Sequence, residues 1–166
     1  PAGTGEEAAF DFSAQDVRHF AFMNPEGVKE SAPQRRLPRA SAKGDWLRFR
    51  PNYQHLGYLD YLLQLPEVPA GKRLLFTGGV IMPRHKNNAC DIRLEVDGNV
   101  VYDDHFKGGT PEREIRADLT AYAGQTVLFT LAIDNRMLFR DVEFTNPMLR
   151  VAAKTSSDAH TDQAEP

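Results

Sequence analysis

The stretch that decides the fold is Asp118-Leu119-Thr120-Ala121-Tyr122-Ala123-Gly124-Gln125, together with the residues that follow it. It predicts a short turn that ends in an Ala-Gly-Gln corner. From Thr126 to Ile133, every second residue from Val127 onward is apolar and faces inward in a β-strand. An irregular segment then leads to a closing strand over Asp141 to Leu149. This order of turn, strand, loop and strand favours an all-β fold.

Other segments carry the same signals of short, half-buried strands. The further predicted strands are Trp46 to Arg50, Tyr58 to Leu65, Lys72 to Met82, Asp91 to Val96, Val100 to Tyr102 and Glu114 to Leu119. Asp97-Gly98 is a tight-turn signal between two of them. Gly78-Gly79 interrupts another, which indicates a bulge or a close approach of two chain segments. Short helical turns are predicted only over Ala14 to Arg18 and Leu119 to Ala123. The pattern as a whole predicts an antiparallel β-sandwich.

Length and composition narrow the choice further. A chain of 166 residues is long enough for one domain with its own core. Hydrophobic residues make up 41% and charged residues 26%, which is ordinary for a globular domain. The net charge of −3 provides no field that attracts nucleic acid or an anionic membrane. No run approaches the roughly 20 apolar residues of a membrane span. We therefore expect neither nucleic acid nor a membrane as a partner.

The two ends lack apolar periodicity. We expect a flexible N-terminal segment over residues 1–9, a β-sandwich domain over residues 10–151, and a flexible C-terminal tail or linker over residues 152–166. Within the domain, Asn24 to Lys43 has no clear periodicity and contains a cluster of arginines. A structureless stretch of that length is either functional or disordered in most compact domains, and its basic side chains are most often simply solvated.

Four motifs together resemble a known family. They are Leu63-Gln64-Leu65-Pro66 with Pro69-Ala70-Gly71, Leu94 to Tyr102, Ala117 to Val127, and Asp141 to Leu149. With them, Leu56 to Leu149 resembles the jelly-roll, galactose-binding-like domains that are accessory modules of secreted bacterial glycoside hydrolases and related polysaccharide-processing enzymes. The closing motif keeps Asn146-Pro147. It carries Phe144 where such domains commonly have Trp, and Met148 where they have a basic residue.

The resemblance implies a jelly-roll sandwich with a binding role. The expected function is a non-catalytic carbohydrate-binding module that targets a polysaccharide-active protein to its glycan, in the extracellular space or the periplasm. The expected partners are an oligo- or polysaccharide and a neighbouring catalytic domain. No cofactor is expected. Similar domains often hold a structural calcium, but no metal ligand is assigned in this sequence.

Sugar chemistry selects the candidate ligand-binding residues. A pyranose has apolar faces and a rim of hydroxyl groups, so its site needs an aromatic platform and planar polar side chains. The candidates are Trp46 and Arg48 on one predicted strand face, Arg84, His85 and Asn87 in one loop, and Arg136 and Arg140 in another. In an antiparallel sandwich both loops can lie at the same end. The competing interpretation is that Trp46 packs in the core and the polar side chains are merely solvated.

Enzymatic signatures are missing from the sequence. No serine lies in a Gly-x-Ser-x-Gly elbow, no Cys/His spacing fits zinc, and Cys90 is interpreted as a small buried apolar residue. Asp103-Asp104-His105 is interpreted as a polar hairpin end. We therefore predict that the chain is not an enzyme.

Two non-catalytic alternatives stay open. The chain can be a structural accessory domain without a ligand, which packs against a neighbouring catalytic domain. That alternative predicts a contiguous apolar patch on a sheet face or around Tyr58 and Tyr61. It can also be a protein-binding adhesion domain, which predicts an interface-sized patch of aromatic residues and arginine.

Overall fold

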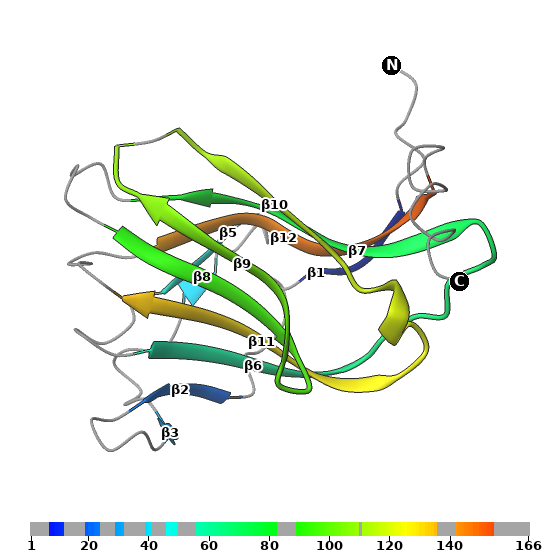
Figure 1. The fold of residues 1–166 in the computed structure, drawn as a ribbon, viewed down its shortest axis with the longest axis horizontal. Coiled ribbons are helices and arrows are strands. Elements are labelled where there is room, and N and C mark those ends of the chain that lie inside the picture. Colours follow the sequence, from blue (N-terminus) through cyan, green and yellow to red (C-terminus); the bar gives the residue numbers. More distant parts are fainter. Residues whose placement is uncertain are drawn as a thin grey trace, which may run out of the picture.

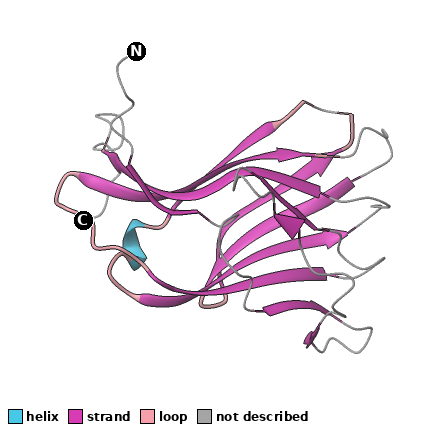
Figure 2. Cartoon of the chain, turned by 180° about the vertical axis from the view of Figure 1, so that it is seen from behind, coloured by secondary structure: helices cyan, strands magenta, loops and turns pink. Residues whose placement is uncertain are grey.

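Two antiparallel β-sheets pack face to face in the computed structural model of the chain (Figure 1). The structure describes the backbone of residues 7–11, 19–23, 29–31, 39–40, 46–49, 56–82, 89–109, 111–135 and 142–154, and the side chains of residues 57–82, 89–109, 111–134 and 142–154. The described chain is almost entirely strand, with one short 3-10 helix (Figure 2). The predicted all-β antiparallel sandwich is thereby confirmed.

The first sheet is organised around its longest strand, β12. The strands of this sheet are β1 (Glu7–Asp11), β4 (Arg39–Ala40), β5 (Trp46–Phe49), β7 (Lys72–Ile81), β10 (Arg113–Asp118) and β12 (Val142–Ala153). Their order is β10-β7-β12-β5-β4, and β1 also pairs with β12. One edge of β12 is shared, because β5 pairs with its first part and β1 with its second part. The other edge pairs with β7.

The second sheet has the order β3-β2-β6-β11-β8-β9. Its strands are β2 (His19–Met23), β3 (Lys29–Ser31), β6 (Leu56–Gln64), β8 (Ala89–Val96), β9 (Asn99–Lys107) and β11 (Thr126–Asn135). The predicted Asp97-Gly98 turn joins β8 and β9. Both turn residues have positive φ, 49° and 81°, as a type I′ turn in a two-residue hairpin loop requires.

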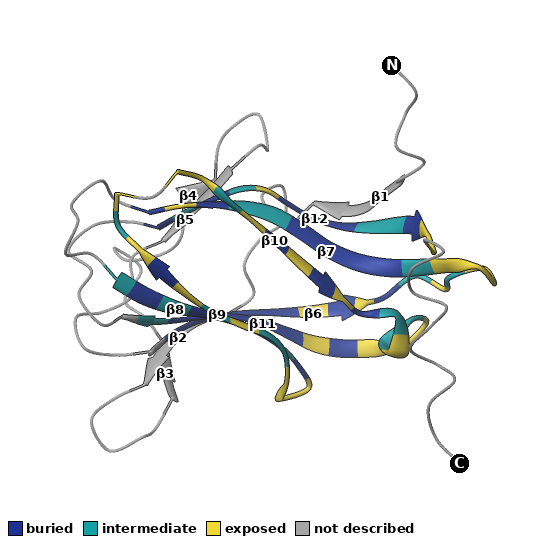
Figure 3. Ribbon diagram, turned by 45° about the horizontal axis from the view of Figure 1, so that its top comes forward, coloured by how far each residue is buried: buried dark blue, intermediate teal, exposed yellow. Residues whose placement is uncertain are grey.

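The core lies between the sheets and is built from the alternating apolar positions of the strands. Along β11 the residues that were predicted to face inward, from Val127 to Ile133, are buried. Phe129 of the second sheet and Phe76 of the first stack with ring centroids 5.5 Å apart. The colours of Figure 3 show the same alternation of buried and exposed positions along β10. Burial of these faces is the main driving force for the two-layer arrangement.

The Ala-Gly-Gln corner connects the two sheets through the 3-10 helix η2 (Thr120–Tyr122). The Thr120 N–H donates to Asp118 Oδ1 at 2.8 Å, and the Thr120 hydroxyl accepts from the Leu74 N–H at 3.0 Å. The Gly124 N–H donates to the Pro66 carbonyl at 3.0 Å. The helical turn predicted over Leu119 to Ala123 is therefore confirmed, and its polar groups tie β10, β7 and the end of β6 together.

Gly124→Ala is expected to lower the free energy of unfolding by about 1–2 kcal/mol. Gly124 has φ 76°, and an added Cβ would lie 3.3 Å from Glu67 Cγ. Denaturant unfolding measures the change. Gly124→Asn is the matched control, because Asn tolerates a left-handed backbone better than Ala does. An alanine variant as stable as the wild type would contradict the role of this glycine.

Several strands were not expected from the sequence. β1 and β2 were not predicted, and β1 begins at Glu7, ahead of the domain start expected at residue 10. The interpretation of Asn24 to Lys43 as structureless is wrong for Lys29–Ser31 and Arg39–Ala40, which form β3 and β4. These short strands lie at or near the edges of the sheets, where pairing with a neighbour supplies the order that their own pattern does not predict. The helical turn predicted over Ala14 to Arg18 lies outside the described residues.

Candidate functional site

An open groove crosses the first sheet on its outer side. Leu74, Phe76 and Val80 of β7 belong to the core, so the alternate positions of this strand face away from it. The groove has a volume of about 540 Å³. The residues that line it come from β7, β10 with the residue before it, and β12, and they are Thr77, Gly78, Gly79, Glu112, Glu114, Arg116, Thr145, Asn146 and Arg150.

A β-bulge in β12 shapes one wall of the groove. Thr145 pairs with Gly79 and Met148 with Thr77, so two residues of β12, Asn146 and Pro147, stand opposite one residue of β7. Asn146 has a φ of 45°, a left-handed conformation that Asn adopts more readily than most residues. Bulges re-aim side chains and tolerate proline. The Asn146-Pro147 motif therefore places an exposed amide side chain at the groove.

Gly79 lets two polar side chains meet over β7. A Cβ at this position would overlap Glu112 Oε1 and Thr145 Oγ1. In its absence, the Thr145 hydroxyl donates a hydrogen bond to Glu112 Oε1. The interpretation of Gly78-Gly79 as a close-approach point is confirmed, and the two side chains that approach there are now identified.

The charges of the groove are balanced, and their contacts include one long ion pair and hydrogen bonds to hydroxyl groups. Two carboxylates, Glu112 and Glu114, and two guanidinium groups, Arg116 and Arg150, line it. Arg116 Nη1 lies 3.8 Å from Glu114 Oε1. Arg150 Nε donates to the Thr77 hydroxyl at 3.1 Å. An exposed ion pair such as Arg116–Glu114 contributes little to stability, so a polar ligand can replace it at small cost.

Two of the sequence-predicted candidates lie next to this groove in the strand register. Trp46 of β5 is directly opposite the groove residue Thr145, and Arg48 is opposite Glu143. The structure describes the backbone of both residues, not their side chains. Their role as ligand-binding residues stays a prediction.

The other five candidates, Arg84, His85, Asn87, Arg136 and Arg140, lie outside the described residues. The strands that flank their two segments are neighbours at one end of the sandwich. Cys90 near the start of β8 pairs with Asn135 at the end of β11, and Ile81 at the end of β7 pairs with Glu143 near the start of β12. The two chain connections therefore begin and end on adjacent strands.

Sequence reasoning did not select Glu112, Glu114, Arg116 or Arg150. In the sequence, each is a charged residue in or beside a strand, which is usually a solvated position. The sequence signals for this region were Gly78-Gly79 and Asn146-Pro147, which both mark departures from a regular β-ladder. Gly78, Gly79 and Asn146 line the groove, and Pro147 lies next to Asn146.

Cys90 is not suited to nucleophilic chemistry. It has no exposed surface, and its Sγ lies 3.5 Å from Met82 Sδ. Burial, together with the charges of Asp91 and Asp134, raises the pKa of the Cys90 thiol to about 12. The thiol is therefore neutral at physiological pH, and the prediction of a buried apolar role is confirmed.

Among the side chains that the structure describes, no group of three or more His, Cys, Asp and Glu residues is arranged to hold an ion. A structural calcium stays a prediction without assigned ligands.

In the described part of the chain, no helix has the length and hydrophobicity needed to cross a bilayer.

Comparison with known proteins gives structural likenesses only. No protein-family model matches the chain, and no curated protein matches it. An apo-form cyclase from Fischerella sp. is similar over 92% of this chain and 100% of the cyclase chain, with 12% identity and a TM-score of 0.47. The C-terminal domain of EclA, a sugar-binding protein, is similar over 78% of this chain and 87% of that domain, with 19% identity and a TM-score of 0.45.

A third similar structure is the C-terminal family 22 carbohydrate-binding module of Clostridium thermocellum Xyn10B. It covers 93% of this chain and 99% of its own chain, with 10% identity and a TM-score of 0.47. The similar structures thus include carbohydrate-binding modules, the class that the sequence resembles, and also an enzyme. With TM-scores below 0.5, these likenesses carry no argument about ligand or activity.

Proposed function

We propose that this chain is a non-catalytic carbohydrate-binding module that holds an oligo- or polysaccharide in the groove of its first sheet. The observation that carries the proposal is the groove itself. It is open, it crosses three strands, and its lining combines carboxylates, guanidinium groups, hydroxyls and an amide. Sugar hydroxyls both donate and accept hydrogen bonds, so a site for them needs both kinds of partner.

The charge balance of the groove favours an uncharged sugar. Two carboxylates and two guanidinium groups line it, so it offers no net charge to a polyanion such as a sulfated glycan. We take Trp46 as the aromatic platform for a pyranose face, because its position opposite Thr145 puts it beside the groove. Arg48 is then a further polar contact on the same strand.

We further propose that the module serves a polysaccharide-active protein in the extracellular space or the periplasm. In that role it keeps a neighbouring catalytic domain close to its glycan through a raised effective concentration. This part of the proposal rests on the family resemblance of Leu56 to Leu149.

Arg150→Ala is expected to weaken glycan binding roughly 10- to 100-fold, because one charge-assisted hydrogen-bonding partner is lost. Isothermal titration against soluble neutral polysaccharides measures the change, after affinity electrophoresis has identified a ligand. Lys154→Ala is the matched control, because it removes one exposed positive charge just beyond the end of β12, outside the groove.

A second pair of variants tests the alternative location at the end of the sandwich. If Arg84→Ala with Arg136→Ala abolishes binding while Arg150→Ala does not, the ligand lies at those two segments and not in the groove. If no glycan binds the wild type, the carbohydrate-binding proposal is wrong.

The alternative of a ligand-free accessory domain has less support. Tyr58 and Tyr61, around which it predicted an exposed apolar patch, are 5% and 2% exposed. Leu62 and Leu128 face each other across β6 and β11 and are exposed, but they are a pair of side chains flanked by Gln64 and Thr126. A docking face of interface size needs a much larger apolar area.

A further inference from the structure

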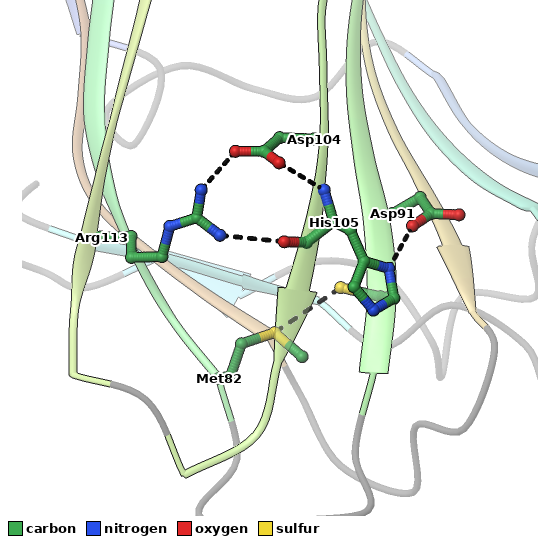
Figure 4. A network of polar contacts seen from close by, with 6 residues as sticks. Met82, Asp91, Asp104, His105 and Arg113 are labelled. Carbon is green, nitrogen blue, oxygen red and sulfur yellow. Dashed lines mark hydrogen bonds and ion pairs between the residues drawn. The ribbon is translucent and has the colours of Figure 1, made fainter.

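One arginine joins the edges of the two sheets beside the groove. β9 is an edge strand of the second sheet, and β10 is an edge strand of the first. Arg113 of β10 donates from Nη1 to the His105 carbonyl at 2.9 Å and from Nη2 to Asp104 Oδ2 (Figure 4). Its guanidinium carbon lies 4.4 Å from the centre of the buried Phe106 ring. We call this set of contacts the clasp.

The β9 side of the clasp is itself held in place. Asp104 Oδ1 accepts from the His105 N–H at 2.7 Å, and His105 Nδ1 lies 2.6 Å from Asp91 Oδ1 of β8 (Figure 4). Burial alone would raise the pKa of Asp104, but the His105 N–H and the Arg113 guanidinium more than offset it and lower that pKa below its ordinary value. Asp104 is therefore a carboxylate at neutral pH and is charged for pairing with Arg113.

Arg113 stands between the two carboxylates of the groove. In the register of β10 with β7 it is opposite the core residue Val80, on the inner side of the sheet. Glu112 and Glu114, one residue to either side, project to the opposite face and line the groove. In residues 112–114, the side chain of Arg113 therefore makes contacts on the inner side of the sheet, and the two carboxylates lie on the outer side.

Two glycines, Gly108 and Gly109, come shortly before this stretch, and Gly109 has a φ of 75°. Glycines increase the conformational freedom that a chain must lose to become ordered. The ladder of β10 with β7 begins at Arg113, opposite Val80, so the side-chain contacts of Arg113 add a second anchor next to Glu112, which lies over Gly79 and accepts the hydrogen bond of Thr145.

We propose that Arg113 is a positioning residue for the groove: by clasping β9 it fixes Glu112 and Glu114 where a ligand meets them, without lining the groove itself. The predicted effect of Arg113 on ligand binding rests on the proposed function of the groove. The structural part of the proposal, the fixed position of residues 112–116, is independent of any ligand. The two parts need separate experiments.

The first experiment is hydrogen exchange of the backbone amides of residues 112–116 in the ligand-free protein. Arg113→Ala is expected to accelerate this exchange about tenfold or more, since it removes two charge-assisted contacts. Arg113→Lys is expected to restore part of the protection, because its ammonium group pairs with Asp104 but does not reach both acceptors in a planar fork. Lys154→Ala should leave exchange at residues 112–116 unchanged. Unchanged exchange in Arg113→Ala would overturn the proposal, whether or not a glycan binds.

The second experiment is a mutant cycle in which titration calorimetry measures the glycan affinity of each variant. Arg113→Ala is expected to weaken binding about tenfold in the wild type and less than about twofold when Glu112→Ala and Glu114→Ala are already present. Equal losses in both backgrounds would show that Arg113 does not act through these carboxylates and would overturn the proposal. Asp104→Asn is the second variant, since it weakens the same clasp at its other end and preserves the side-chain shape.

Failure of the positioning role and failure of the proposed function give different results. If Arg113→Ala accelerates exchange and the wild type binds no glycan, the positioning role is supported and the proposed ligand of the groove is wrong. If the wild type binds glycan and Arg113→Ala changes neither exchange nor affinity, the proposed function stands and the positioning role is overturned.

Discussion

Phe129→Ala is expected to lower the free energy of unfolding by about 3–5 kcal/mol, the largest stability loss we expect from a single substitution in this chain. The Phe129 side chain has no exposed surface, and it stacks on Phe76 of the opposite sheet with an interplanar angle of 27°. Its removal leaves a cavity at the contact between the two sheets. Chemical denaturation with a fluorescence or circular dichroism signal measures the loss.

The neighbouring residue provides the control. Leu128 is 40% exposed and projects from the other face of β11. Leu128→Ala is expected to cost about 1 kcal/mol or less, because only part of its surface leaves water on folding. Similar losses for the two variants would mean that Phe129 and Leu128 do not differ in burial as the alternation predicts.

The clearest of the predicted strands have their own buried face. β8 alternates strictly, and the inward residues of β8 and β11 form much of the core. β1 lacks that kind of signal. It becomes a strand because the long β12 offers it a free edge, with Phe10 opposite Leu149. Edge pairing depends on which segments meet in space, and a pattern within one segment does not contain that information.

The turn at Asp97-Gly98 shows the same limit on a smaller scale. The turn was predicted from its residue types, and its positive φ angles suit those residues. Asp97 also receives the Leu128 N–H on its Oδ1 at 2.8 Å and donates its own N–H to the Leu128 carbonyl at 2.9 Å. These bonds extend the pairing of β8 with β11 beyond Val96. No local rule predicts them, because Leu128 is far along the chain.

The candidate site was harder to predict than the fold for a related reason. A groove on a sheet face collects residues from three strands, and each of them alone resembles a solvated position. Glu112, Thr145 and Gly79 become a unit only through the register of β7 with β12 and β10. The sequence marked Gly79 as unusual, but it did not identify which side chains need the space.

Gly79→Val is expected to weaken glycan binding at least about 100-fold, the largest binding loss we expect, with a much smaller loss of stability. A Cβ at residue 79 overlaps Glu112 Oε1 and Thr145 Oγ1, which are side-chain atoms and not backbone. The backbone tolerates the change, because φ at Gly79 is not positive and valine suits a strand. The steric cost therefore displaces groove residues and does not unfold the sheet. Titration calorimetry measures the affinity, and thermal unfolding confirms that the variant is folded.

Two further variants separate a blocked groove from a damaged fold. Leu128→Ala lies on the other sheet and should bind glycan as the wild type does. Gly79→Val with Glu112→Ala removes the carboxylate that the new side chain displaces, so it should recover stability without recovering affinity, because Glu112 itself is needed for binding. If Gly79→Val binds glycan normally, the space above β7 is not occupied by ligand, and the site must be sought at the end of the sandwich where Cys90 pairs with Asn135. A folded Gly79→Val protein that has lost its ligand would locate the sugar on the face where β7, β10 and β12 meet.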